Sequence, residues 1–278
     1  MKLRLGFQYD QLLRDILNLV YPSPKPCLLC GRPESEPGRI GLCAGCQQAI
    51  AESRRGTAIC SKCGKFLECG GGSAGGPNSA DGPRVPVAEG LCRDCRNGGH
   101  PFEIARAVGP YEGVLKEGIE KLKFSGCREL GIPFGRLMAR VVASDPGFVP
   151  TDLVVPVPLH RERLRERNFN QAELLATALA GELFIPLNPH LLVREIRTGI
   201  QSKLGRAERR LNLAGAFRVS GSGSAELKNI LLVDDIYTTG ATVGECARVL
   251  LNAGAKGVNV IALAAGKQAA GIFPMERE

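Results

Sequence analysis

Hydrophobic and polar positions follow two patterns from about residue 101 onward. Short unbroken apolar runs predict buried strands, and apolar positions that recur every three or four residues predict amphipathic helices. Runs of the first kind cover 152–158, 229–234 and 257–263. Periodicity of the second kind covers 170–183 and 241–252, and Gly254 is placed to end the second helix. Because the connections are short, the pattern predicts an α/β fold, a parallel sheet with helices on both faces.

The part of the chain before residue 100 has a different pattern. Apolar residues gather on one face over 8–21, which predicts an amphipathic helix within an N-terminal segment, 1–26. We interpret it as packing on its own protein, with a partner-binding role as the alternative. Residues 27–99 are rich in Gly, Pro and Ser and cannot pack a core unaided. Within this module, 70–89 is a Gly-rich insert. The third predicted domain is the α/β part, 100–278.

Composition is that of an ordinary globular protein, and it constrains the compartment. Apolar residues make up 44% of the 278 and charged residues 23%, and there is no Trp. Asp10, Arg14 and Asp15 interrupt the first apolar stretch, so no signal peptide is expected. No run approaches the roughly 18 apolar residues of a membrane span. We therefore expect a cytoplasmic protein with no membrane span.

Eleven cysteines in a reducing compartment indicate metal binding in preference to disulfides. Eight of them form four Cys-x-x-Cys pairs: Cys27 and Cys30, Cys43 and Cys46, Cys60 and Cys63, Cys92 and Cys95. Two such pairs complete the tetrahedral shell of one structural zinc ion, so two Zn²⁺ sites are predicted. Sequential pairing is the simplest arrangement, and a crossed pairing, disulfides, a redox pair and iron–sulfur ligation stay open. Zinc-bound thiolates would lower the formal net charge of +8 to about +4.

Three further cysteines and one histidine need no metal. Cys69 has no partner at metal-ligand spacing, and Cys127 and Cys246 lie in apolar, helix-like contexts that predict core positions. His100 is not expected to replace a cysteine ligand, because eight thiolates are available.

The segment 229–242 carries the clearest chemistry. Its strand is predicted to end in Asp234 and Asp235, before a loop with Thr238, Thr239, Gly240 and Thr242 and then a helix. The helix N-terminus offers unpaired N–H groups to a phosphate, and glycine allows close approach. The two carboxylates suit ribose hydroxyls or a cation. The alternative is an ordinary acidic turn, and neither a Walker A loop nor a dinucleotide-binding Gly motif is present.

Residues 231–242 (LLVDDIYTTGAT) resemble the PRPP-binding motif of type I phosphoribosyltransferases. With the four Cys pairs, the chain resembles the ComF/ComFC family, a double zinc ribbon followed by a phosphoribosyltransferase domain, which is linked to natural competence and DNA uptake. Further matches are the segments 155–158, 167–171, 201–204, 209–212 and 216–217. The insert at 70–89 departs from a compact second ribbon.

The resemblance implies a site for PRPP and Mg²⁺. Asp234 and Asp235 would hold the ribose hydroxyls and serve catalysis, and Mg²⁺ would bridge the pyrophosphate. The implied PRPP-binding residues also include Val157 of the pyrophosphate loop, Arg167, Tyr237, Thr238, Thr239, Gly240, Ala241 and Thr242. For Arg161, Arg163, Arg165 and Arg167, pyrophosphate contact competes with a solvated basic helix face. A second basic cluster, Lys203 to Arg210, suits a closing loop or a nucleic-acid contact.

Two functions from different classes follow from these features. The first is a phosphoribosyltransferase, a pentosyl glycosyltransferase that releases pyrophosphate. The second is a competence factor without catalysis, in which the zinc ribbons contact single-stranded DNA or a helicase and PRPP regulates. The sequence names no acceptor for the transfer.

Overall fold

The computed structural model describes residues 26–33, 41–68, 90–148, 150–196, 213, 215–221 and 225–268. The helix expected over 8–21, the insert 70–89, Cys69 and the basic cluster Lys203 to Arg210 lie outside the described residues. Of the described helices, none is long and apolar enough to span a bilayer.

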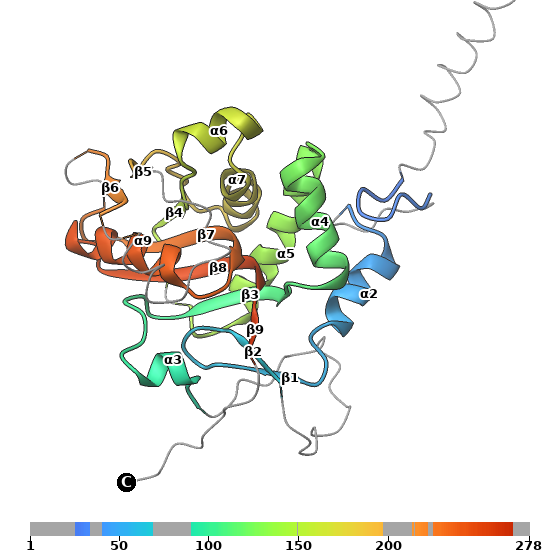
Figure 1. The fold of residues 1–278 in the computed structure, drawn as a ribbon, viewed down its shortest axis with the longest axis horizontal. Helices are drawn as coiled ribbons and strands as arrows, with labels where there is room; N and C mark the ends of the chain where they lie inside the picture. The colour runs from blue at the N-terminus through green and yellow to red at the C-terminus, as the bar shows by residue number, and fades with distance from the viewer. Residues whose placement is uncertain are drawn as a thin grey trace, which may run out of the picture.

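A four-stranded parallel sheet forms the centre of the fold (Figure 1). Its order is β3 (Ala105–Pro110), β8 (Gly257–Ala265), β7 (Asn229–Tyr237) and β4 (Leu153–Pro156). The three predicted strands are all present. Strand β7 continues beyond Asp234, because Ile236 and Tyr237 pair with Ala264 and Ala265 of β8. Asp234 and Asp235 therefore lie inside the strand and do not end it, which corrects the sequence-based boundary.

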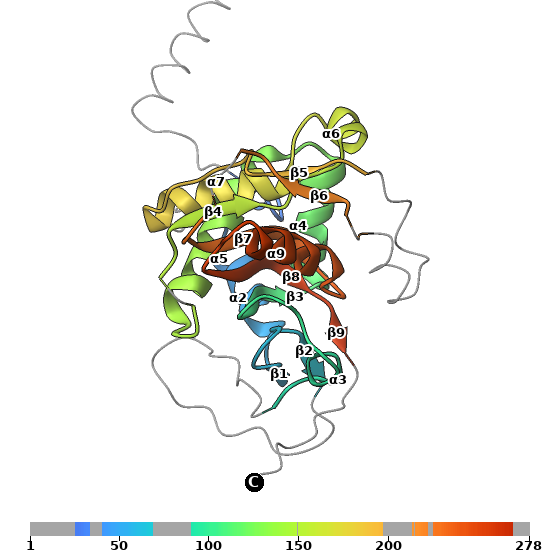
Figure 2. The ribbon, with the colours of Figure 1, turned by 90° about the vertical axis from the view of Figure 1, so that its left-hand side faces the viewer.

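Both faces of the sheet are covered, which confirms the predicted fold class (Figure 2). Along β7, Leu231 and Val233 pack with α4, α5 and α7, whereas Ile230 and Leu232 pack with α9. Successive strand residues point to opposite faces, so one buried strand contributes to two apolar cores. The covering helices are α4 (Gly113–Phe124), α5 (Gly131–Ser144), α7 (Gln171–Leu183) and α9 (Ala241–Asn252).

The remaining described elements of the α/β part surround the carboxyl edge of the sheet. A short helix, α6 (Arg161–Arg167), follows β4, and a 3-10 turn, η1 (Arg128–Leu130), precedes α5. The antiparallel pair β5 (Leu192–Arg194) and β6 (Phe217–Val219) lies beside α9.

Where the structure describes the Cys-rich module, at 27–33, 41–68 and 90–99, it forms two short helices and a hairpin. These are α2 (Ala44–Glu52), β1 (Thr57–Ile59), β2 (Phe66–Glu68) and α3 (Arg93–Arg96). Strand β9 (Lys267–Gln268), from the far end of the described chain, pairs in parallel with β2 and adds a third strand to the hairpin. The module and the α/β part are thus joined by backbone pairing, and the domain boundary at residues 99 and 100 stays a prediction.

The Cys-rich module covers the edge strand β3. The Ala105 N–H donates to the Lys62 carbonyl at 2.8 Å, and the Arg106 guanidinium donates to the Ser61 carbonyl at 3.1 Å. Gly64 has a φ of +62°, and a Cβ there would lie 2.1 Å from the Ala105 carbonyl oxygen. Only glycine permits this approach. The free edge of β3 is thereby protected against pairing with another strand.

Candidate functional site

The carboxyl end of β7 leads directly into the N-terminus of α9. Gly240 precedes the first helical turn with a φ of +79°, a conformation that favours glycine. The Ala241 N–H donates to the Thr239 hydroxyl at 3.3 Å. Thr238 is exposed, and Thr239 and Thr242 are half-buried. An anion at this loop would meet threonine hydroxyls at the positive end of a helix dipole.

Two predicted site residues are turned away from solvent. Tyr237 is 3% exposed, and its hydroxyl lies 3.3 Å from His100 Nε2. Val157 is buried, its N–H donates to the Val233 carbonyl at 2.9 Å, and its own carbonyl accepts from the Asn170 side chain at 3.0 Å. The side chains of Tyr237 and Val157 thus support the site from the protein interior.

The two adjacent carboxylates point to opposite sides of β7. Asp235 faces α4, where Lys123 Nζ lies 2.9 Å from its Oδ2. Asp234 faces α9 and β5, where Cys246 and Arg194 are its electrostatic neighbours. This divergence follows from the two-residue period of a strand. Each carboxylate therefore has its own electrostatic environment.

Asp234 is held close to the neutral state. Burial raises its pKa to about 8, and the negative charge of Asp235 adds to this rise. The Asp235 N–H, which donates to Asp234 Oδ1 at 2.8 Å, acts in the opposite direction, as do the charges of Lys123 and Arg194. The pKa above 7 makes Asp234 mostly protonated at neutral pH, so it can donate a hydrogen bond as well as accept one.

Lys123 and Arg194 are site residues that the sequence analysis missed. Lys123 lies in the last turn of α4, and Arg194 ends the three-residue strand β5. Burial lowers the pKa of Arg194, and its guanidinium carbon lies 5.4 Å from the centre of the Phe217 ring. No local motif surrounds either cation, and the only sequence signal was the lysine-rich end of a helical pattern at 121–123.

The structure separates Arg167 from the other arginines of α6. Arg161, Arg163 and Arg165 are exposed, as a solvated helix face requires. Arg167 is half-buried, donates to Gln171 Oε1 at 3.0 Å and lies 5.4 Å from the centre of the Phe124 ring. Burial lowers the pKa of Arg167, and the charge of Asp235 opposes that shift. Among these four, Arg167 is the half-buried arginine, and it interacts electrostatically with Asp235. The exposed Arg163 lies near enough to act on Arg194.

The eight paired cysteines gather into two groups of four. Within each group the sulfur atoms lie within 4.8 Å of one another. The members follow the sequential pairing: Cys27, Cys30, Cys43 and Cys46 in the first group, and Cys60, Cys63, Cys92 and Cys95 in the second. His100 and Cys246 belong to neither group. Cys246 is fully buried in α9, which confirms its predicted core position. Cys127 is half-buried before η1 and packs against the margin of the core formed by α4, α5 and α7.

The geometry of both groups fits a tetrahedral zinc ion. Zinc–sulfur bonds of about 2.3 Å place tetrahedral sulfurs about 3.8 Å apart. The observed sulfur separations are 3.9 Å for Cys27–Cys46, 3.6 Å for Cys30–Cys43 and 3.5 Å for Cys63–Cys92. Backbone N–H groups donate to sulfurs, for example Cys92 to Cys60 at 3.2 Å. Such donors stabilise thiolates, and four protein ligands leave no open position, so two structural zinc ions could be held here.

The two cysteine groups pack on opposite faces of the sheet. Cys27, Cys43 and Cys46 belong to the apolar cluster of α4, α5 and α7. The four cysteines of the second group belong to the cluster of α9. The module thus extends around the β3 edge and reaches both cores.

A parallel sheet covered on both faces, with an acidic strand leading into a Thr-rich loop and a helix, defines a protein of the phosphoribosyltransferase-like class. Comparison with known proteins agrees. The chain is 30% identical over 240 residues to the DNA utilization protein YhgH of Salmonella typhi, covering 85% of this chain and 95% of that protein. It is 36% identical over 173 residues to competence protein ComFC of Bacillus subtilis (59% and 67%) and 28% identical over 242 residues to competence protein F of Haemophilus influenzae (86% and 96%). The chain belongs to the ComF family.

Protein-family models and solved structures do not refine this family assignment. No protein-family model matches the chain. The glutamine PRPP amidotransferase of B. subtilis is 20% identical, with a TM-score of 0.37 over 52% of this chain and 30% of that chain. The family assignment rests on the sequence relatives and not on this similarity.

Zinc analysis tests the two groups. We expect native mass spectrometry to find two zinc ions per chain, and Cys43→Ser to lose one of them because its sulfur belongs to the first group. Cys127→Ser is the matched control and should keep both. A Cys43→Ser variant that retains two zinc ions would contradict the assignment.

The raised pKa of Asp234 makes stability depend on pH. The folded-state pKa of Asp234, about 8, lies above the value near 3.9 of an unfolded aspartate, so between these values the folded chain holds the extra proton. Stability therefore falls as pH rises towards 8. Asp234→Asn removes this contribution.

In urea unfolding at pH 6, 7 and 8 with zinc present, the parent should lose more stability than Asp234→Asn. Other titrating groups are common to both proteins and cancel in the comparison. Equal pH dependence in the two proteins would show that Asp234 is ionised in the folded state.

Proposed function

We propose that this protein binds the ribose 5-phosphate group of PRPP at the carboxyl end of β7. One observation carries the proposal: a buried strand delivers Asp234 and Asp235 directly ahead of a Thr-rich loop at a helix N-terminus. The 5′-phosphate would lie on Thr238 to Thr242, where helix N–H groups favour an anion. The carboxyl groups would hold the ribose 2′- and 3′-hydroxyls, and the protonated Asp234 would supply a donor.

The pyrophosphate would extend towards β4 and α6. The Val157 turn follows β4, which is hydrogen-bonded to β7, so turn and loop are neighbours at the same edge of the sheet. Arg167 is close enough for its charge to interact with Asp235, and a guanidinium pairs well with phosphate oxygens. Mg²⁺ would enter with PRPP and neutralise the pyrophosphate charge.

This arrangement suits phosphoribosyl transfer. The bond between the anomeric carbon and pyrophosphate would break, pyrophosphate would leave with the electron pair, and an acceptor nucleophile would bond to the carbon. Positive charge develops on the ribose in such a reaction, and a fixed carboxylate nearby stabilises it. Asp235 would supply that negative charge, oriented by Lys123.

Relatives named as competence and DNA utilization proteins support a role beyond ligand binding. We propose that the protein assists DNA uptake, with single-stranded DNA or a competence helicase as partner. Exposed arginines on α6 and α3 suit contacts with a phosphate backbone: Arg161, Arg163, Arg165, Arg93 and Arg96. A protein that binds PRPP only as a regulatory ligand is the second candidate, and it differs by the absence of pyrophosphate release.

Calorimetric titration with PRPP and Mg²⁺ tests the site. The parent should bind, and Asp234→Asn/Asp235→Asn should lose at least tenfold in affinity because the ribose contacts weaken. Asp152→Asn is the matched control: Asp152 accepts from the Asn229 N–H at the opposite end of β7. Absence of binding to a folded, zinc-loaded parent would reject PRPP and leave the DNA contacts as the function.

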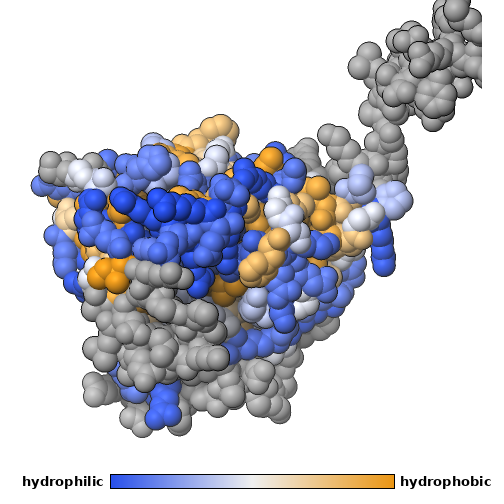
Figure 3. Space-filling model, turned by 45° about the horizontal axis from the view of Figure 1, so that its top comes forward, coloured by the Kyte–Doolittle hydropathy of each residue, from blue (hydrophilic) through white to orange (hydrophobic). Residues whose placement is uncertain are grey.

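An exposed aromatic ring lies beside the predicted ribose site. Phe124 follows Lys123 and is 75% exposed, and the Arg167 guanidinium lies over its ring. Figure 3 shows apolar patches (orange) within the mainly hydrophilic described surface. An exposed phenylalanine under a cation is a surface on which a planar base can stack. We propose that Phe124 contacts the base of the acceptor or product.

Paired ligands test this contact. A nucleoside 5′-monophosphate such as AMP should bind more tightly than ribose 5-phosphate, by about 5- to 100-fold if the base stacks. Phe124→Ala should abolish the difference and leave ribose 5-phosphate affinity unchanged. Phe184→Ala, at a ring 94% exposed beyond the end of α7, should change neither. A difference that persists in Phe124→Ala would rule out the contact.

A further inference from the structure

The last residue of β7 points away from the ligand edge and into the Cys-rich module. The Tyr237 hydroxyl lies 3.3 Å from His100 Nε2, a contact between residues 137 positions apart. The His100 ring stacks on Phe102 with a centroid distance of 4.8 Å, and Tyr237 meets both rings edge-on at 6.2 and 6.4 Å. Three rings from two parts of the chain thus form one buried cluster.

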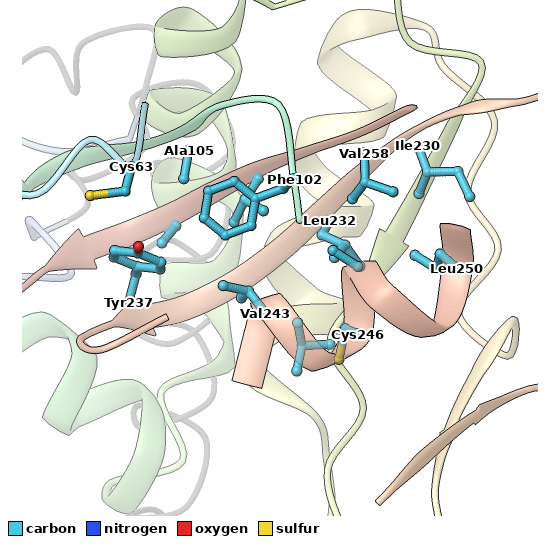
Figure 4. Close-up of a cluster of buried hydrophobic side chains, with 14 of the residues drawn as sticks. Cys63, Phe102, Ala105, Ile230, Leu232, Tyr237, Val243, Cys246, Leu250 and Val258 are labelled. Atoms are coloured by element: carbon cyan, nitrogen blue, oxygen red, sulfur yellow. The ribbon is translucent and has the colours of Figure 1, made fainter. Parts of the chain in front are cut away.

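The second cysteine group lies directly against this cluster. Figure 4 shows Cys63 beside the Tyr237 ring. Lys65 Nζ lies 5.9 Å from the centre of the same ring and 2.7 Å from Asp94 Oδ2. Asp94 belongs to α3, between Cys92 and Cys95. Tyr237 therefore lies beside Cys63 and Lys65, and the Lys65–Asp94 ion pair connects it to the segment that carries Cys92 and Cys95.

The Thr-rich loop, Thr238 to Thr242, is the proposed phosphate loop, and it packs on the other side of the same rings. A Cβ on Gly240 would lie 2.5 Å from His100 Cε1 and 2.8 Å from the Tyr237 hydroxyl. A Cβ on Gly244, in the first turn of α9, would lie 3.6 Å from His100 Nδ1. The loop cannot move inward without displacing His100 or Tyr237. His100 contacts Tyr237, and Tyr237 lies beside Cys63 of the second cysteine group.

We propose that Tyr237 and His100 are positioning residues that couple the second cysteine group to the phosphate loop. The metal-bound group and the ligand-bound loop favour the same arrangement of the two rings, so each stabilises the other. This coupling rests on the proposed phosphate ligand of the loop. The first cysteine group packs on the opposite face of the sheet and serves as an internal reference.

One consequence needs no ligand. Gly240→Ala should crowd both rings and accelerate zinc release from the second group to a colorimetric chelator about fivefold or more, the lower end of typical coupling between sites. Gly254→Ala is the matched control: it has a φ of +90° at the other end of α9, and a Cβ there would meet only Glu226. Cys30→Ser removes a ligand of the first group and so changes only the release phase of that group. The unchanged phase then belongs to the second group. Equal rates in the two glycine variants would overturn the coupling.

The reciprocal experiment uses the ligand, because coupling between two sites acts in both directions. PRPP with Mg²⁺ should slow zinc release from the second group alone. Tyr237→Phe, which removes the hydroxyl contact with His100, should keep two zinc ions but lose most of this protection.

Different experimental outcomes would overturn the coupling and the proposed PRPP binding. PRPP that binds in calorimetry without slowing zinc release would overturn the coupling and leave the ligand site intact. PRPP that does not bind would overturn the proposed function, while the comparison of Gly240→Ala with Gly254→Ala would still decide whether the loop and the metal group communicate.

Discussion

The parallel pairing of β7 with β4 on one side and β8 on the other is the constraint on which the rest of the structure depends. It holds the strand at the centre of the sheet, with an apolar core on each face. Its fully buried run, Ile230 to Val233, is apolar, and its two carboxylates follow in the carboxyl-terminal half of the strand. Backbone geometry alone brings together the carboxylates, the Thr-rich loop and the start of α9, without any side-chain contact between them.

The Cys-rich module contributes to the structure of the α/β part despite its small size. It protects the β3 edge through backbone bonds, gains a third strand from the far end of the described chain and reaches both cores with its cysteines. Because structural zinc sites form only in the folded chain, metal-binding free energy contributes to folding free energy. Metal held in this module would thus stabilise the sheet that carries the ligand loop.

Electrostatics divides the candidate site into two environments, and this division suits the proposed ligand, PRPP. Asp235 is paired with Lys123, while Asp234 is kept close to neutral by burial. An entirely anionic pair would repel PRPP, which is itself highly charged. One protonated carboxyl and two nearby cations, Lys123 and Arg167, would reduce that repulsion and keep the groups proposed to recognise ribose.

The sequence by itself determined the features that depend on residues close together along the chain. The apolar runs and periodicities predicted three strands and two helices, the Cys-x-x-Cys spacing predicted the metal groups, and 231–242 indicated the loop. Only the tertiary structure decided which cysteine pairs share a group, that Arg167 and not its neighbours turns inward, and that Lys123, Arg194 and Phe124 lie at the site. The physical reason is that periodicity reports how a residue relates to its neighbours along the chain. Contacts such as His100–Tyr237, between residues 137 positions apart, depend instead on how whole elements pack.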